Sequence, residues 1–485
     1  MRGTTDFIDQ KREKPKEIDA LERIATWKEY QKPFPEEKLK IQASRCMECG
    51  TPFCQMGELI GRQTSGCPLY NLIPEWNTLA AQGKWEEAYY RLLLTNNFPE
   101  FTSRACPAPC EGSCTAGLVS EPVTIKSIEK AIIDRAYKEG WVKPRIPLKR
   151  NGLKVAVVGS GPAGMAAADD LNQAGYDVTV FEKEDRFGGL LMYGIPNMKI
   201  EKQYVQRRID LLQAEGIEFI ANTEIGKDIT LEELQETYDA VLLCIGAEKQ
   251  REIDIPGRGL KGIYPAMEYL KTSTKHLLDN GGNGEPRITA KGKKVIVIGG
   301  GDTGADCVAT AIRQGCKSVV QFGKHGELPK ERPEHEPWPV NPSLFTLDYA
   351  YEETFKAFGE DPRKYYIQTT EFLGNEDDEV TGLLTVPFTD EPVAEKQLWK
   401  ADLVLIAIGF EGVDPTKAAG AELQNGRIQT RPGSFQTNRE GVFAAGDAKR
   451  GASLIVWAMQ EGKKAAKEIE LYLAQKTAAA QLPSV

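Results

Sequence analysis

The chain has 485 residues, of which 41% are hydrophobic and 27% charged, and its formal net charge is −9. A single small domain is excluded, since a typical domain has roughly 150 residues. No run of about 18 apolar residues could span a bilayer, and the acidic balance without a long basic block excludes a nucleic-acid partner. The first residues lack the apolar core of a secretory signal, so we expect a cytoplasmic protein without disulfides.

The N-terminal third combines a charged arm with a cysteine-rich helical region. Residues 1–35 have few periodic apolar positions, which fits either a docking strap or a disordered tail. Three segments between residues 36 and 145 have apolar residues at helical spacing, separated by loops rich in Pro, Gly and Cys. The pattern predicts a small helical domain within residues 1–150, ending in a linker at 142–152.

Strands alternate with helices after this linker. Residues 154–183 have the pattern of a strand, a glycine turn, a helix and a second strand, and residues 293–324 repeat it. Two such units predict a pair of doubly wound α/β domains with parallel sheets. Shorter apolar runs, which we interpret as buried strands, lie at 239–247, 401–410 and 441–448. We expect boundaries at 151–260, 261–400 and 401–485, with the first and last segments forming one domain.

The first glycine turn carries Gly159, Gly161 and Gly164 between a predicted strand and a predicted helix. These positions permit a tight turn, backbone approach to a pyrophosphate and close helix packing. Glu182 ends the next strand, where a carboxylate can accept hydrogen bonds from ribose hydroxyls. The combination favours a dinucleotide site over a simple tight turn.

The second glycine turn carries Gly299, Gly301 and Gly304, but no acidic residue ends its second strand. A carboxylate there would repel a 2′-phosphate, whereas Lys324 or Arg332 could pair with one. The sequence therefore favours NADPH over NADH at this unit. The alternative is that both cations are solvated surface charges.

Two nucleotide units suggest two cofactors, and FAD with a nicotinamide nucleotide is the expected pair. Gly446 and Asp447 precede the last predicted helix. The resulting order of flavin half, nicotinamide domain and second flavin half resembles the pyridine-nucleotide flavin oxidoreductases, in which a late Gly-Asp pair contacts FAD. Asp447 could equally be a helix N-cap. A cysteine pair beside either unit, as a redox-active disulfide would need, is missing.

Seven of the ten cysteines lie between residues 46 and 114, in the patterns C-x2-C-x4-C-x12-C and C-P-x2-C-x3-C. Short spacings of this kind let one loop supply several thiolates to an iron–sulfur cluster. Structural zinc favours paired CxxC arms or Cys with His, and the three histidines lie outside this region. Iron–sulfur is therefore favoured over zinc and over free thiols.

Several segments together resemble the small (beta) subunits of glutamate synthase and, more distantly, the N-terminal half of dihydropyrimidine dehydrogenase. The resemblance covers essentially the whole chain. It is carried by RCMECGTPFC, GCPLYNLIPEWN, NNFPEFTSRACPAPCEGSC, PVTIKSIEKAIID, GGLLMYGIPNMK, GGGDTGADC and GVFAAGDAKRGASLIVWAMQEGK. It implies an α/β protein in which an N-terminal α-helical iron–sulfur domain precedes two Rossmann-like domains for FAD and NADPH, the FAD domain being split in sequence.

The resemblance also implies two 4Fe-4S clusters and their ligands. One cluster would be held by Cys46, Cys49, Cys54 and Cys114, and the other by Cys67, Cys106, Cys110 and Glu129. The carboxylate would explain the odd number of cysteines. One departure is that twelve residues separate Cys54 from Cys67, more than in other members, which weakens the assignment of Cys67.

The same resemblance assigns residues to the nucleotides. FAD would contact Gly161, Pro162, Ala163, Gly164, Met165, Glu182, Lys183, Gly189, Leu190, Lys199, Gly446 and Asp447. NADPH would contact Gly300, Gly301, Asp302, Thr303, Lys324, Arg332, Ala407, Ile408 and Gly409.

The activity that the resemblance implies is NADPH oxidation through FAD and the clusters. The electrons would pass to a glutamate synthase large (alpha) subunit, which forms L-glutamate from 2-oxoglutarate and L-glutamine. Two alternatives remain at this stage. One is an NADPH oxidoreductase of the same architecture that reduces ferredoxin or another acceptor, and the other is a zinc-stabilised, redox-responsive interaction module.

Overall fold

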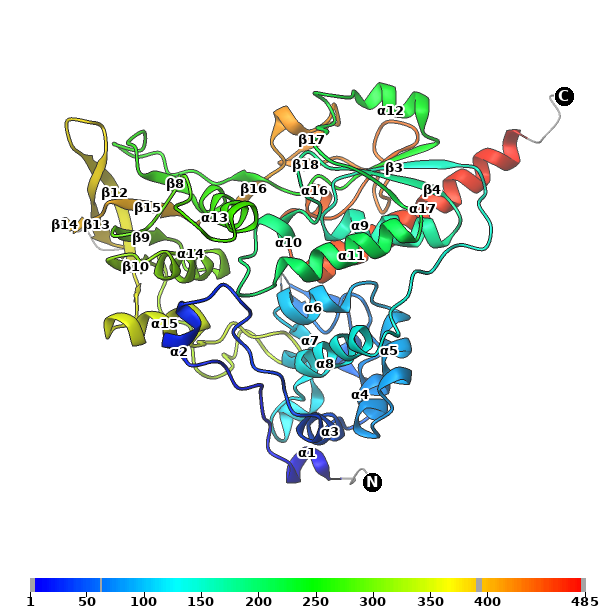
Figure 1. The fold of residues 1–485 in the computed structure, drawn as a ribbon, viewed down its shortest axis with the longest axis horizontal. Coiled ribbons are helices and arrows are strands. Elements are labelled where there is room, and N and C mark those ends of the chain that lie inside the picture. Colours follow the sequence, from blue (N-terminus) through cyan, green and yellow to red (C-terminus); the bar gives the residue numbers. More distant parts are fainter. Residues whose placement is uncertain (1–4, 62, 390–394, 481–485) are drawn as a thin grey trace.

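The computed structural model describes residues 5–61, 63–389 and 395–480. Figure 1 shows three regions: a helical region at the N-terminal end, a sheet region that contains β3 and β4, and a second sheet region that contains β9 and β10. The first two regions share one continuous hydrophobic core, whereas the second sheet region has its own apolar clusters. Within the described part of the chain, no helix is long and apolar enough to cross a membrane.

In the helical region, helices form in the three segments where the sequence predicts them, and shorter helices form outside these segments. Its elements are α1 (Asp6–Asp9), α2 (Ala20–Ile24), α3 (Glu36–Ser44), η1 (Phe53–Gln55), β1 (Glu58–Ile60), β2 (Gln63–Ser65), α4 (Ile73–Ala81), α5 (Trp85–Leu93), α6 (Pro99–Ala105), α7 (Pro109–Gly112), η2 (Thr115–Leu118) and α8 (Ile125–Lys138). The apolar stretch around residue 83 is broken into α4 and α5 because Gly83 turns the chain with a φ of 74°.

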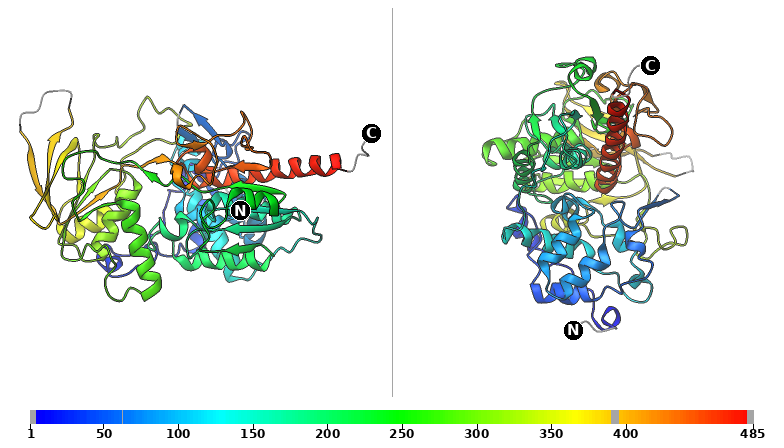
Figure 2. Two further views of the ribbon diagram at one scale, coloured as in Figure 1. Left: turned by 90° about the horizontal axis from the view of Figure 1, so that it is seen from above. Right: turned by 90° about the vertical axis from the view of Figure 1, so that its right-hand side faces the viewer.

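The first nucleotide-binding domain is a five-stranded parallel sheet in the order β19-β6-β3-β4-β5. Its strands are β3 (Lys154–Val158), β4 (Asp177–Phe181), β5 (Glu218–Ile220), β6 (Ala240–Leu243) and β19 (Val442–Ala444). Its helices are α9 (Pro162–Gln173), α10 (Leu190–Tyr193), α11 (Lys202–Ala214), α12 (Leu231–Thr237), α16 (Asp447–Arg450) and α17 (Ile455–Ala480). The long helix α17 packs along α9 and extends beyond the sheet (Figure 2).

The second domain is also a five-stranded parallel sheet, in the order β11-β10-β9-β15-β8. Its strands are β8 (Ile263–Pro265), β9 (Lys294–Ile298), β10 (Ser318–Phe322), β11 (Arg363–Lys364) and β15 (Leu403–Ile406). Helices α13 (Ala266–Asn280), α14 (Asp302–Arg313) and α15 (Tyr349–Phe358) accompany it. A separate antiparallel sheet comprises β12 (Ile367–Gly374), β13 (Val380–Pro387) and β14 (Gln397–Lys400).

The domain boundary expected at residue 400 requires correction. Strand β15 follows that position, yet it pairs with β8 and β9 of the second sheet. The chain crosses between the domains at β7 (Lys249–Gln250) and β16 (Phe410–Gly412), which pair with each other in antiparallel fashion. The smaller elements η3 (Pro415–Lys417), β17 (Leu423–Gln424) and β18 (Arg427–Ile428) follow this crossing. Because all buried parallel strands have similar apolar patterns, the sequence alone does not show which of the two sheets β15 joins.

The N-terminal arm is a strap, which we define as residues 11–34. It crosses from the helical region to α14 and α15 of the second domain (Figure 1). Arg23 is fully buried there, and its guanidinium donates to Glu353 Oε1 at 2.7 Å. Tyr30 stacks on Tyr349 with ring centroids 4.8 Å apart. Of the two interpretations of this arm, the docking strap is the one that the structure confirms for the described residues.

Candidate cofactor sites

The first glycine turn connects β3 to α9, and its backbone leaves no room for a side chain at Gly159 or Gly164. Gly159 has a φ of 101°, and a Cβ added to it would lie 2.4 Å from the carbonyl oxygen of Cys244. A Cβ on Gly164 would lie 1.9 Å from the carbonyl oxygen of Gly159. Gly161, in contrast, has open space at its Cβ position and borders a cavity. This geometry matches the separate roles predicted for the three glycines.

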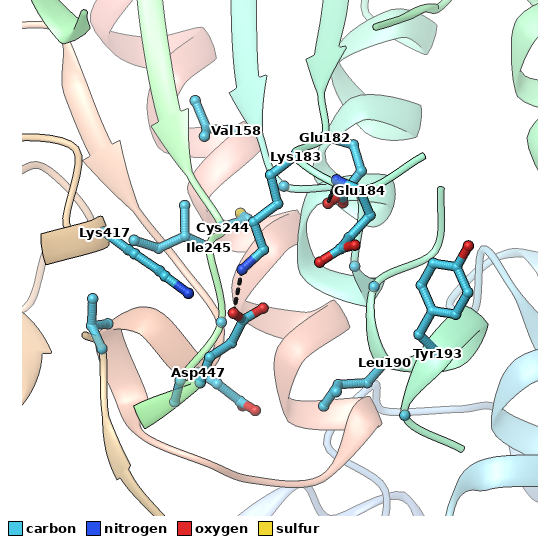
Figure 3. Close-up of a pocket in the computed structure, with 18 of the residues that line it drawn as sticks. Val158, Glu182, Lys183, Glu184, Leu190, Tyr193, Cys244, Ile245, Lys417 and Asp447 are labelled. Atoms are coloured by element: carbon cyan, nitrogen blue, oxygen red, sulfur yellow. Dashed lines mark hydrogen bonds and ion pairs between the residues drawn. The ribbon is translucent and has the colours of Figure 1, made fainter. Parts of the chain in front are cut away.

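The cavity has a volume of about 450 Å³, enough for a large part of a dinucleotide, and lies where β3, β4 and β6 end. Figure 3 shows Lys183 and Lys417 extending into it from different segments, and the Lys183 ammonium pairs with Glu248. Of the residues assigned to FAD, those that border the cavity are Gly159, Gly161, Pro162, Ala163, Glu182, Lys183, Gly189, Leu190 and Asp447. The residues Gly164, Met165, Lys199 and Gly446 are not among its lining.

Glu182 is buried at the edge of the cavity and held by three donors. One carboxylate oxygen accepts from the backbone N–H of Ser160 at 3.1 Å and from its hydroxyl at 2.5 Å. The other accepts from the backbone N–H of Glu184 at 3.0 Å. The carboxylate is thus fixed at the cavity, as a ribose acceptor must be.

Asp447 lies at the opposite wall, as the first residue of α16. The N-cap of this helix is Gly446, so the N-cap interpretation of Asp447 is wrong. Ser453 donates its hydroxyl to the Asp447 carboxylate at 2.9 Å. Burial, together with nearby Glu461, raises the pKa of Asp447 to about 6. A carboxylate so placed can accept a hydrogen bond from a cofactor hydroxyl or donate one when protonated.

Lys199 lies away from this cavity. Its ammonium pairs with Asp306 of α14 at 2.7 Å, and the hydroxyl of Tyr349 donates to the same carboxylate at 2.9 Å. Asp306 and Tyr349 belong to the second domain, so Lys199 links the two nucleotide-binding domains. The sequence shows only that a lysine follows the GGLLMYGIP segment. It does not show whether this lysine contacts a cofactor or a carboxylate of the other domain.

The second glycine turn repeats the geometry of the first between β9 and α14. Gly299 has a φ of 128°, and a Cβ on it would lie 2.1 Å from the carbonyl oxygen of Ala407. The side chain of Gln321 donates to the carbonyl oxygen of Gly299 at 2.6 Å. The turn therefore adjoins the end of β15, which brings together the residues assigned to NADPH around it: Gly300, Gly301, Asp302, Thr303, Gly304, Ala407, Ile408 and Gly409.

The two cations expected to bind a 2′-phosphate differ in their surroundings. Lys324 is exposed after β10, with its ammonium 4.3 Å from the ring centroid of Phe388. Arg332 donates to the carbonyl oxygens of Val340 at 2.6 Å and of Gly112 at 2.9 Å. Arg332 thus fastens its loop to α7 of the helical domain, which leaves Lys324 as the more available cation.

The cysteines gather into two adjoining groups. Burial raises the pKa of the Cys54 thiol, and Cys114, Cys46, Cys49 and Cys67 act on it in the same direction. The backbone N–H of Cys67 donates to the carbonyl oxygen of Cys54 at 2.9 Å. The antiparallel strands β1 and β2 lie between them in sequence, so the insertion does not separate the two cysteines.

The second group surrounds a small buried cavity bordered by Cys67, Cys106, Cys110 and Glu129. Asn96 and Thr102 both donate to Glu129 Oε1, at 2.9 and 2.7 Å. Burial raises the pKa of Glu129 to about 7. Three thiols and a carboxylate around one cavity form a donor set that suits an iron–sulfur cluster.

Sequence reasoning missed the residues that support these sites. Ser160 occupies the variable position inside the first glycine turn, where no general pattern marks it as the partner of Glu182. Lys417 borders the FAD-sized cavity but belongs to no motif, and Tyr193, which also borders it, lies within GGLLMYGIPNMK without an assigned role. Lys126 and Trp76 border the cysteine–glutamate cavity, and their types resemble ordinary surface and core residues.

These features define an iron–sulfur flavoprotein oxidoreductase of the pyridine-nucleotide type. Two family models agree with this class. Residues 23–141 match a model described as dihydropyrimidine dehydrogenase domain II, 4Fe-4S cluster. Residues 153–336 and 364–462 match a model described as pyridine nucleotide-disulphide oxidoreductase.

The chain belongs to the family of glutamate synthase small chains. It is 57% identical to the glutamate synthase [NADPH] small chain of Bacillus subtilis, over 98% of this chain and 99% of that one. It is 40% identical to the small chain of Azospirillum brasilense, over 98% and 97% of the two chains. It is also 46% identical to part of the glutamate synthase [NADH] of Schizosaccharomyces pombe, over 97% of this chain and 23% of that protein.

Among solved structures, the chain resembles Mycobacterium tuberculosis FprA in complex with NADPH. The TM-score is 0.51 at 19% identity, over 69% of this chain and 87% of that one. This likeness concerns the fold alone. Together with the family matches, it confirms the predicted α/β architecture. The family matches by themselves confirm the expected cofactor classes, which are iron–sulfur clusters, FAD and NADPH.

Proposed function

We propose that this chain oxidises NADPH and delivers the electrons to a glutamate synthase large subunit, which forms L-glutamate from 2-oxoglutarate and L-glutamine. The observation that carries the proposal is the closeness of two cavities along α17. Val456 borders the cysteine–glutamate cavity, and Ala458, two residues later, borders the FAD-sized cavity. A flavin and a cluster in these places would be neighbours, as direct electron transfer requires.

The bound groups supply the redox chemistry: FAD accepts a hydride from NADPH and releases electrons singly, which suits iron–sulfur clusters. The protein binds and orients them. The first glycine turn, Glu182 and Asp447 hold FAD, and the second turn with residues 407–409 holds the nicotinamide nucleotide. The exposed Lys324 favours NADPH, since its ammonium can pair with the 2′-phosphate. In this scheme the chain works in the cytoplasm.

We assign two 4Fe-4S clusters to the helical domain. The first is held by Cys46, Cys49, Cys54 and Cys114. The second is held by Cys67, Cys106, Cys110 and Glu129, whose Oε1 accepts from Asn96 and Thr102. Cys49 is the most exposed of the seven cysteines, so the first cluster is nearer the surface where a partner docks.

The direct test mixes the purified holoprotein with a glutamate synthase large subunit and measures glutamate formed from 2-oxoglutarate and glutamine. NADPH oxidation should be coupled to glutamate formation. NADPH-dependent reduction of ferredoxin without coupling to the large subunit would contradict the proposal. About eight irons with acid-labile sulfide are expected per chain, whereas zinc without sulfide would contradict the cluster assignment.

A further inference from the structure

The cysteine–glutamate cavity contains two side chains that are not needed as ligands. Lys126 borders the cavity with Cys106 and Glu129. Lys126 and Glu129 are three residues apart in α8, which places them on the same face of that helix. Trp76 of α4 borders the same cavity and has an exposed fraction of 0%.

The position of Lys126 is unusual for a lysine. It lies in the first turn of α8, where the helix dipole favours acidic residues, and this turn contains none. Lys130, one turn later, pairs with Glu29 at 2.9 Å. In the described residues, in contrast, the Lys126 ammonium has no hydrogen-bond or ion-pair partner. Cys106, Glu111 and Glu129 attract this ammonium, whereas Lys199 repels it.

Trp76 adds a second observation at the same place. Its indole N–H is buried, and no acceptor for it lies among the residues that the structure describes. A buried N–H without a partner is costly, which is why nearly all such groups are satisfied in folded proteins. An acceptor within the cavity would remove this cost.

We propose that Lys126 and Trp76 are positioning residues for the cluster at Cys67, Cys106, Cys110 and Glu129, and that both raise its reduction potential. The inference rests on the second cluster of the proposed function. Three thiolates and a carboxylate are all anionic, and one-electron reduction adds a further negative charge. A half-buried ammonium and a buried N–H donor stabilise that reduced form more than the oxidised one, because interactions between charges are strong in a poorly solvated site.

The test is a reductive titration of the anaerobic holoprotein, followed by the paramagnetic signals of the clusters, with mediators and a low-potential reductant. In the wild type we expect two separate reduction steps. Lys126→Met should move one of them to a more negative potential, and Trp76→Phe should move the same step in the same direction by less. The other step serves as an internal reference, and Lys138→Gln, an exposed lysine at the end of the same helix, should move neither.

If both reduction steps of Lys126→Met occur at the wild-type potentials, the inference is overturned and the proposed function is unaffected. If the potentials of Trp76→Phe equal those of the wild type, the indole has no part in the inference. If Lys126→Met fails to retain iron, Lys126→Gln removes the charge with less change in polarity, and the same shift is expected. A wild-type protein with about four irons and a single step would contradict the second cluster itself, and therefore the cluster assignment of the proposed function.

Discussion

At the scale of single residues, Glu182 shows how the flavin site is organised before any cofactor binds. Ser160 donates to one of its carboxylate oxygens and the backbone N–H of Glu184 donates to the other, so the carboxylate needs little further ordering. Hydrogen bonds to a charged acceptor contribute about 1.5–3 kcal/mol each. The role of this acid as a ribose acceptor stays a prediction, and the residue that holds it could not be found from the motif.

Glu182→Gln should weaken FAD binding by about tenfold or more, because the neutral amide accepts at one atom only and turns its NH₂ group toward donors. FAD titrated into the apoprotein, with flavin fluorescence as the signal, measures the change. Glu236→Gln, at an exposed position of α12, serves as the control and should bind FAD normally. Equal affinities in the two variants would contradict the role of Glu182.

Lys202 is a buried lysine without a carboxylate partner. Its ammonium donates to the carbonyl oxygens of Leu191 at 2.8 Å and Ile195 at 2.6 Å, which fixes the segment that borders the FAD-sized cavity. Burial lowers the pKa of Lys202 to about 7. The unfolded chain therefore binds a proton that the folded chain lacks at pH values between about 7 and 10.

It follows that the stability contributed by Lys202 is complete above its usual pKa and is lost as the pH falls toward about 7. Lys202→Met removes this dependence, so the wild type should gain stability relative to the variant as the pH rises through that window. The temperature of flavin release, measured across the window, reports the difference. Lys227→Met, an exposed control in the same domain, should follow the wild type. A constant difference between wild type and Lys202→Met would refute the assignment.

At the scale of elements, the strap joins the helical domain to the second sheet domain through buried charges. Arg23 and Arg313 share the Glu353 carboxylate, at 2.7 and 2.6 Å, and all three side chains are inaccessible. At the other end of the strap, Glu29 pairs with Arg104 of α6 at 2.6 Å. The strap thus restrains the nucleotide domain against the helical domain.

Arg23→Gln should lower the free energy of unfolding by about 3 kcal/mol, because removing one partner of a buried ion pair leaves uncompensated charge. We expect a lower urea midpoint and faster proteolysis within residues 11–34. Lys16→Gln, at an exposed position in the same strap, is the matched control. Proteolysis at the wild-type rate in Arg23→Gln would show that this ion pair does not hold the strap.

The elements also show how far sequence reasoning reaches. Glycine turns and cysteine spacings are local patterns, and these predicted both nucleotide units and the cysteine-rich helical domain. The strap depends on Arg23 meeting Glu353, which lies 330 residues away, and no local pattern encodes such a pair. The sheet to which β15 belongs, and the use of Arg332 and Lys199 as interdomain links, are long-range properties of the same kind.

At the scale of the whole molecule, the helical domain and the flavin domain share one hydrophobic core, but the two cofactor cavities are lined by different residues. Arg208 of α11 donates to Glu100 of α6 at 2.6 Å in the buried interface. The wall between the two sites is the first turn of α17. Flavin binding and cluster binding should therefore be separable in experiment.

Removal of iron by a chelator should destabilise the helical domain, because cysteine ligands that lose their metal no longer contribute binding energy to folding. The flavin should stay bound and should still be bleached by NADPH under anaerobic conditions. Thermal unfolding and rapid mixing with NADPH measure the two effects, with untreated holoprotein as the reference. Loss of flavin in parallel with iron would contradict this separation.

The crossing of the chain at β7 and β16 has a consequence for biosynthesis. Strand β3, at residues 154–158, and Ala458 on α17 both border the FAD-sized cavity, and the whole second domain lies between them in sequence. A chain that leaves the ribosome from its N-terminus must hold the first sheet without β19 while the second domain is made. The FAD-sized cavity is thus complete only after α17 has been made, when the inserted domain has already had the opportunity to fold.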